Sequence, residues 1–78
     1  MSNQTADEYR WDGAHLRAMI ALRDANKGKI ADKLGVSPNT ITNWTRGRTQ
    51  PSAEALYGLA LYLDCTIAEL IGKPKGER

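Results

Sequence analysis

Apolar residues recur along most of this chain at steps of three and four residues, which is the spacing of one face of an α-helix. The pattern predicts five short helices and lacks the alternation typical of a strand, so the expected fold class is all-α. The predicted helices span residues 11–26, 26–35, 38–46, 52–63 and 66–72. Residues 1–10 and 73–78 are polar and aperiodic, and we expect a flexible N-terminal tail and a charged C-terminal tail around one domain of residues 11–72.

Each predicted helix has at its start an N-cap residue whose side chain can accept hydrogen bonds from the free backbone N–H groups of the first turn. The expected caps are Asp12, Asn26, Ser37, Ser52 and Thr66. Glu69 follows Thr66 by three positions, as in a capping box. Trp11 and Leu16 are spaced for a hydrophobic staple around Asp12. The inward stripes of the helices consist of Leu16, Met19, Ile20, Arg23, Ile30, Ala31, Leu34, Ile41, Trp44, Leu56, Leu59, Ala60 and Leu63, with Arg23 near the end of the first stripe.

The stretch IADKLGVSPNTITNW, residues 30–44, places a turn between two short helices. It has a small residue where the helices would touch, a glycine four positions later, an apolar residue to fill the corner, and two apolar anchors on the second helix. These residues are Ala31, Gly35, Val36, Ile41 and Trp44. Their offsets predict a helix-turn-helix over about residues 27–46. The alternative is a helical hairpin within an unrelated bundle.

These residues resemble the Cro/phage-repressor-type (Xre-type) helix-turn-helix family. The stretch IADKLGVSPNTITNWTRGR contains the family's Leu-Ala-x-x-Leu-Gly-Val-Ser motif, with Ile30 in place of the first leucine. The stretch PSAEALYGLALYLDCTIAELIG resembles the family's capped fourth helix and short fifth helix, and the resemblance covers about residues 15–72. It implies a compact five-helix lambda-repressor-like DNA-binding domain whose third helix enters the major groove of double-stranded DNA.

Four short polar residues lie on the predicted third helix away from the anchors Ile41 and Trp44. They are Asn39, Thr40, Thr42 and Asn43. Asparagine can pair with adenine through N6 and N7, and threonine offers a hydroxyl to a base edge and a methyl group to thymine. We therefore expect these side chains to contact bases. The alternative is an exposed helix face that carries polar residues without reading DNA.

Charge is distributed unevenly, although the net charge of the chain is only +2. Residues 23–50 carry six Lys or Arg and two Asp, whereas residues 51–72 carry three acidic and no basic residues. A basic face of this kind suits a polyanion, and the alternative is a set of solvated surface charges. The expected phosphate contacts are Lys27, Lys29, Ser37, Arg46 and Arg48. Many members of the resembled family have glutamine at the position of Lys27, so this corner departs from their pattern.

The two tails carry further basic residues, which are Arg10, Lys73, Lys75 and Arg78. Either tail could lie along the DNA backbone or in the minor groove, or serve only as a polar end that keeps the domain in solution. The 78 residues could also be a fragment of a longer regulator, with the segment after Gly72 as the start of a linker.

The fourth and fifth predicted helices carry more apolar residues than one core stripe requires. The surplus residues are Tyr57, Leu61, Ile67 and Ile71. An exposed apolar patch favours association, and groove-binding domains of this type act as dimers on two half-sites about one helical turn apart. We therefore expect a homodimer on a palindromic operator. In one alternative these side chains close the small core; in another they hold a partner protein, as in an antitoxin that also binds its own operator.

No constellation of catalytic or metal-ligating residues accompanies these patterns. The only histidine and cysteine, His15 and Cys65, fall in separate helices, and GKPKGER lacks the glycine loop and the Ser or Thr of a phosphate loop. No apolar run reaches the ~20 residues of a membrane span. We expect no enzyme activity, cofactor or metal. The prediction is a cytoplasmic, nucleoid-associated transcriptional regulator that represses by occupying its operator.

Overall fold

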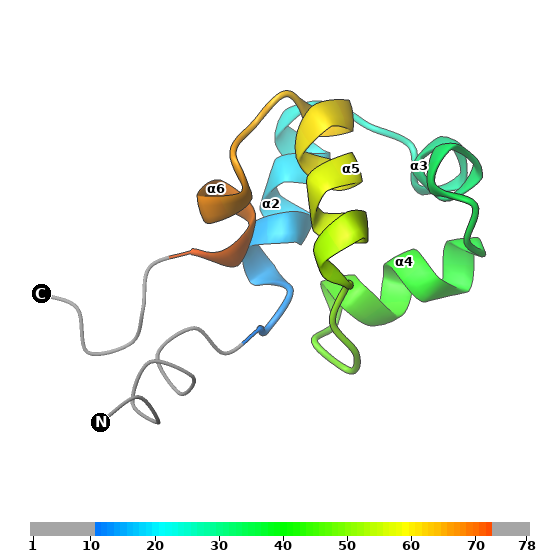
Figure 1. The fold of residues 1–78 in the computed structure, drawn as a ribbon, viewed down its shortest axis with the longest axis horizontal. Coiled ribbons are helices and arrows are strands. Elements are labelled where there is room, and N and C mark those ends of the chain that lie inside the picture. Colours follow the sequence, from blue (N-terminus) through cyan, green and yellow to red (C-terminus); the bar gives the residue numbers. More distant parts are fainter. Residues whose placement is uncertain (1–10, 73–78) are drawn as a thin grey trace, which may run out of the picture.

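The computed structural model describes residues 11–72, and this part of the chain forms five α-helices (Figure 1). The helices are α2 (Ala14–Leu22), α3 (Lys27–Leu34), α4 (Pro38–Thr45), α5 (Ala53–Leu63) and α6 (Ile67–Ile71). The prediction of a compact, all-α domain resembling the lambda-repressor-like domains is confirmed. The predictions for residues 1–10 and 73–78, including DNA contacts by Arg10, Lys73, Lys75 and Arg78, lie outside the described residues.

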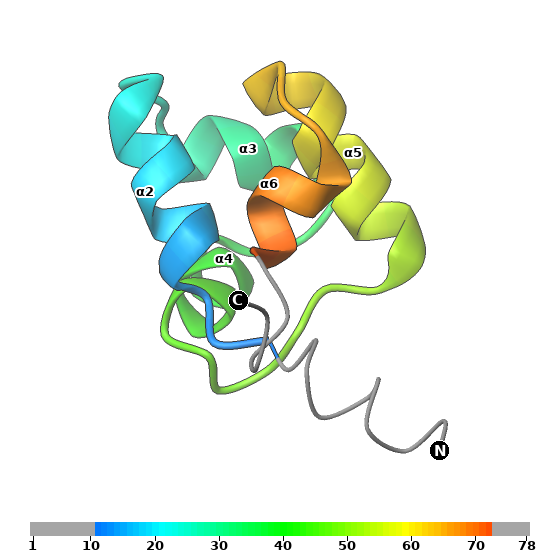
Figure 2. The same ribbon diagram turned by 90° about the vertical axis from the view of Figure 1, so that its left-hand side faces the viewer.

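The helices surround one apolar core to which each of them contributes. The helices α2 and α5 flank the core, α6 lies against both, and α3 lies on the side opposite α6 (Figure 2). The helix α4 packs against α3 and α2. The core side chains least accessible to solvent are Leu16, Ile30, Ile41, Leu59, Leu63 and Leu70. The apolar positions of the predicted inward stripes are therefore correct, with Met19, Leu34 and Leu56 half-buried at the edge of the core, whereas Arg23 is exposed.

Four of the five predicted caps form as expected. Asn26 accepts a hydrogen bond from the N–H of Lys29, and the side chains of Ser37 and Ser52 accept from the third residue after each of them. Thr66 and Glu69 form the predicted capping box, with Thr66 Oγ1 accepting from Glu69 N at 3.0 Å and Glu69 Oε1 accepting from Thr66 N at 2.8 Å. Such caps each stabilise a helix by about 1 kcal/mol.

The start of α2 differs from the prediction. Its N-cap is Gly13, with φ at 83°, rather than Asp12. Asp12 lies one position before this N-cap, and its carboxylate still accepts a hydrogen bond from the N–H of Ala14 in the first turn at 2.9 Å. With the cap shifted, Trp11 and Leu16 no longer occupy staple positions, although both are buried. The shift arises because the chain turns through a left-handed glycine that lies against the end of α4.

The end of α2 also differs, because the helix stops at Leu22 instead of running on to the cap of α3. Asp24 takes a left-handed conformation with φ at 53°, which turns the chain. Arg23 leaves the helix at this point, and its Nε and Nη2 atoms donate to the carbonyl oxygens of Leu63 and Asp64 at 2.8 and 2.9 Å. The arginine therefore joins the end of α2 to the end of α5. Within residues 11–72, every helix is too short to cross a membrane.

Candidate nucleic-acid interface

The helix-turn-helix consists of α3, a short turn and α4. Gly35 adopts φ 74°, a left-handed conformation that glycine reaches without steric cost, and ends α3. The N–H of Val36 then donates to the carbonyl of Ala31 at 2.9 Å, which closes the corner. Ser37 starts α4, and its hydroxyl accepts from the N–H of Thr40 at 3.2 Å. The turn geometry predicted from the sequence is present.

The inner face of α4 is packed into the core. Ile41, Trp44 and Thr45 are all buried, and the hydroxyl of Thr45 donates to the carbonyl of Thr42 at 2.7 Å. The sequence predicted the first two of these positions and missed Thr45, whose hydroxyl is satisfied within its own helix. Because a helix turns 100° per residue, burying these three positions fixes which side chains of α4 face outward.

The predicted base contacts lie on or beside that outward face. Asn39 and Asn43 are one helical turn apart, opposite the buried positions; Asn39 is exposed and Asn43 half-buried. Thr42 is half-buried beside them. Thr40 lies further round the helix, and its Oγ1 is 3.0 Å from that of exposed Ser37. The two asparagines are therefore the best placed to meet base edges, while contact with bases stays a prediction.

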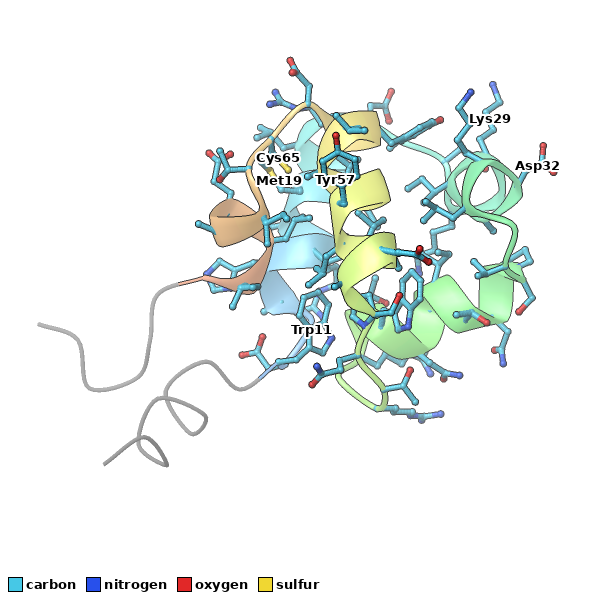
Figure 3. The ribbon with its side chains drawn as sticks, viewed as in Figure 1. Trp11, Met19, Lys29, Asp32, Tyr57 and Cys65 are labelled. Carbon is cyan, nitrogen blue, oxygen red and sulfur yellow. The ribbon has the colours of Figure 1, made fainter. Side chains whose placement is uncertain are left out.

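Basic side chains lie at both ends of the helix-turn-helix. Arg46 is the C-cap of α4, and Arg48 follows in the loop, where its backbone N–H donates to the carbonyl of Asn43 at 3.0 Å. Both side chains are exposed. Lys27 is half-buried at the first position of α3. Lys29 projects from α3 on the side away from α4, so it is set apart from the two arginines (Figure 3). Phosphate contacts by these residues stay predictions.

The C-terminal end of α4 is held by residues to which sequence analysis gave no such role. The indole Nε1 of Trp11 donates to the carbonyl oxygen of Trp44 at 2.8 Å, and Nη1 of Arg17 donates to that of Thr45 at 2.9 Å. Gly13 lies so close that an added Cβ would overlap the Trp44 carbonyl. We refer to Trp11, Gly13 and Arg17 as the brace of α4. Its contacts join residues 28 and 33 positions apart, so no local pattern reports them.

Residues 19–70, two thirds of the chain, match the sequence pattern of the helix-turn-helix family HTH_3. The chain belongs to this family. The family comprises DNA-binding regulators of the Xre/Cro/C1 type and is non-enzymatic. The predicted family and the prediction of a DNA-binding regulator are thereby confirmed. No curated protein matches the chain in sequence.

Several solved structures resemble this HTH_3 protein. The P22 c2 repressor in complex with a synthetic operator is 29% identical, with a TM-score of 0.70 over 83% of this chain and 94% of the repressor. The clp gene regulator ClgR from Corynebacterium glutamicum is 27% identical, with a TM-score of 0.69 over 80% of each chain. The restriction-modification controller protein C.AhdI from Aeromonas hydrophila is 25% identical, with a TM-score of 0.68 over 83% of this chain and 97% of the controller.

Apolar side chains reach the surface of this HTH_3 protein on α5. Tyr57 and Leu61 are 61% and 65% exposed, and Tyr57 projects from the outer side of the helix (Figure 3). Ile67 of α6 is 37% exposed. Ile71 differs from the prediction, because it is half-buried and packs against the core, where the last turn of α6 closes the domain. The predicted patch is thus reduced to Tyr57, Leu61 and Ile67, and its role as a dimer surface stays a prediction.

The described residues contain no group of three or more His, Cys, Asp or Glu that could hold a metal ion. Cys65 is a half-buried free cysteine. Burial raises the pKa of its thiol, and the carboxylate of Glu69 acts in the same direction. The thiol is therefore held in its protonated, less nucleophilic form at neutral pH.

Proposed function

We propose that this HTH_3 protein is a transcriptional repressor that binds a palindromic operator as a homodimer and reads base edges through α4. The observation that carries the proposal is the division of α4 into two faces. Ile41, Trp44 and Thr45 anchor one face in the core, and Asn39 and Asn43 lie on the other. A helix held this way can enter a major groove as a rigid body, with its short polar residues facing the base edges.

Each class of side chain has its own part in the proposed complex. The amides of Asn39 and Asn43 pair with adenine N6 and N7, and the threonines of α4 contact neighbouring base edges. Arg46 and Arg48 neutralise phosphates beyond the end of α4, and Lys27 does so at the start of α3, where the free N–H groups of the first turn also attract an anion. A repressor needs no further chemistry, since occupancy of a promoter excludes polymerase. The P22 c2 repressor, which has the same fold, binds a synthetic operator.

The proposed dimer forms through the exposed apolar side chains of α5. Tyr57 and Leu61 are four positions apart and share one face of the helix. A two-fold axis across this face would bring the same residues of two copies together, as a symmetric dimer requires. Two recognition helices related by that axis would read half-sites about one helical turn apart.

Selection of binding sites from a random duplex library tests the proposed function. Recovery of an inverted repeat with half-sites about 10 bp apart is the expected result. The affinity of the protein for the selected duplex should then be measured at two salt concentrations and compared with its affinity for a random duplex. Binding that is weak, steeply salt-dependent and equal for every duplex would contradict the proposal, because it would reduce the basic face to a non-specific polyanion contact.

An antitoxin is the second candidate function, and the exposed Tyr57 and Leu61 are the observation that favours it. In that case the patch on α5 holds a partner protein while α4 still binds operator DNA. The two candidates differ in what covers the patch. A homodimer that persists without any other protein supports the repressor, whereas a monomer that binds a toxin through this patch supports the antitoxin.

A further inference from the structure

Two arginines, Arg17 within α2 and Arg23 directly after its last residue, make the same kind of contact with the ends of two different helices. Arg17 donates to the carbonyl of Thr45 at the last position of α4, and Arg23 donates to the carbonyls of Leu63 and Asp64 at the end of α5. The last carbonyls of a helix lack partners within the helix and carry partial negative charge. A guanidinium at this point therefore satisfies an acceptor and stabilises the helix end.

Only the first of these contacts acts on the helix that faces DNA. The end of α4 also receives the indole N–H of Trp11, which is itself buried and bonded to the carbonyl of Trp44 at 2.8 Å. Gly13 lies against the same carbonyl without room for a side chain. Two directional bonds and one close packing contact thus fix where α4 ends in relation to α2.

We propose that Arg17 and Trp11 are positioning residues for operator recognition. They hold the end of α4 and thereby set the angle at which Asn39 and Asn43 meet the base edges. This inference rests on the proposed function and goes beyond it, because neither residue faces bases. Paired hydrogen bonds to a base tolerate little displacement, whereas attraction to phosphates is much less directional. Loosening the brace should therefore reduce operator binding more than it reduces binding to random DNA.

A direct phosphate contact by Arg17 is the rival explanation, because a guanidinium has five donors and only one of them is used at Thr45. The two roles differ in their salt dependence. A lost phosphate contact weakens binding to every duplex alike and lowers the salt slope by about one unit. A lost positioning contact leaves the slope unchanged and lowers the ratio of operator affinity to random-duplex affinity.

The test compares three variants of the full chain, Arg17→Gln, Trp11→Phe and Arg23→Gln, on the selected operator and on a random duplex at two salt concentrations. Trp11→Phe removes the N–H donor without changing charge, so it separates positioning from phosphate contact. Arg23→Gln is the matched control, since it removes the same type of bond from α5. Circular dichroism establishes a temperature at which all three variants are folded.

We expect Arg17→Gln and Trp11→Phe each to lower the affinity ratio about tenfold, with less than about a twofold loss on random DNA. Arg23→Gln should lower the melting temperature and leave the ratio unchanged. An equal loss on both duplexes, an unchanged ratio for Trp11→Phe, or the same change of ratio for Arg23→Gln would overturn the inference alone. The absence of any preferred duplex for the unmodified protein would overturn the proposed function, and this inference with it.

Discussion

Asn43 lies on the outward face of α4, one turn from Asn39 and opposite the buried Ile41. Its amide is the group we expect to read an adenine. The substitution Asn43→Ala should cost about 1–3 kcal/mol on the selected operator and relax the base preference at one position of each half-site. Competition binding with single-base variants of the operator measures this effect. A uniform loss across all of those duplexes would exclude Asn43 as a reader of sequence.

Arg46 should behave differently, because its exposed guanidinium stands at the end of α4 and is expected to meet a phosphate. The substitution Arg46→Ala should weaken binding to operator and random DNA by similar factors and lower the salt slope by about one unit. Titrations from about 50 to 200 mM salt provide the slope. A change of base preference in this variant would instead indicate that Arg46 reaches into a groove.

At the scale of the element, local sequence determines where four of the five helices begin. Ser52 is a simple case, since its side chain is exposed and its hydroxyl accepts a hydrogen bond from the N–H of Ala55 at 3.1 Å. The substitution Ser52→Ala should lower the free energy of unfolding by about 1 kcal/mol. Denaturant unfolding followed by circular dichroism measures it. Ser52→Asn keeps an acceptor at the cap and should stay near the original stability; equal losses in both variants would point to a cause other than the cap.

The beginning of α2 could not be predicted in the same way. Asp12 has the chemistry of a cap, but the chain places Gly13 there because the approach to the Trp44 carbonyl leaves no room for a Cβ. That constraint comes from Trp44, which lies 31 positions after Gly13 in the sequence (44 − 13), so local propensity and spacing do not contain it. Caps at Asn26, Ser37, Ser52 and Thr66 depend on neighbours three positions away, and these were predicted correctly.

Gly13 itself supports a prediction at this scale. The substitution Gly13→Ala adds a methyl group where the backbone is left-handed and the end of α4 is in contact. It should destabilise the domain by about 1–3 kcal/mol through backbone strain and displacement of α4. Thermal unfolding gives the change, and Gly35→Ala is an informative companion, because it combines the same backbone strain with open space around the Cβ. A smaller loss for Gly13→Ala than for Gly35→Ala would contradict the importance of the close approach.

The whole molecule presents the outward face of α4 and the apolar side chains of α5 as two separate surfaces. If α5 mediates dimer formation, Leu61→Lys should weaken the dimer about tenfold or more by placing a charge at the centre of the interface. Sedimentation equilibrium measures the dimer constant directly. Leu22→Lys is the matched control, because Leu22 is 68% exposed, close to the 65% of Leu61, but lies on α2. Equal effects of the two substitutions, or none, would remove α5 from the interface.

Sequence analysis could predict the part of the candidate interface that lies within a single helix. Asn39, Asn43 and the buried anchors all lie within α4, so a 3.6-residue period sorts them into two faces. Sequence analysis could not predict the contacts between helices. The partners of Arg17 and Trp11 are backbone carbonyls, which every residue has, so nothing in the sequence distinguishes Trp44 and Thr45 as acceptors. The burial of Ile71 was missed for a related reason, because a pattern of apolar residues does not say which of them the last turn of a short helix covers.

The chemistry of the brace also has a consequence for how operator preference can diverge. Trp11 and Arg17 bond to the main chain of α4, and Gly13 packs against it, so the brace does not depend on which side chains the helix presents to DNA. Exchanging the outward residues of α4 would leave these attachments intact. In the proposed complex, the contacts that set the position of α4 are therefore separate from the side chains that read the operator, so descendants of such a protein can acquire new targets by changing the outward residues alone.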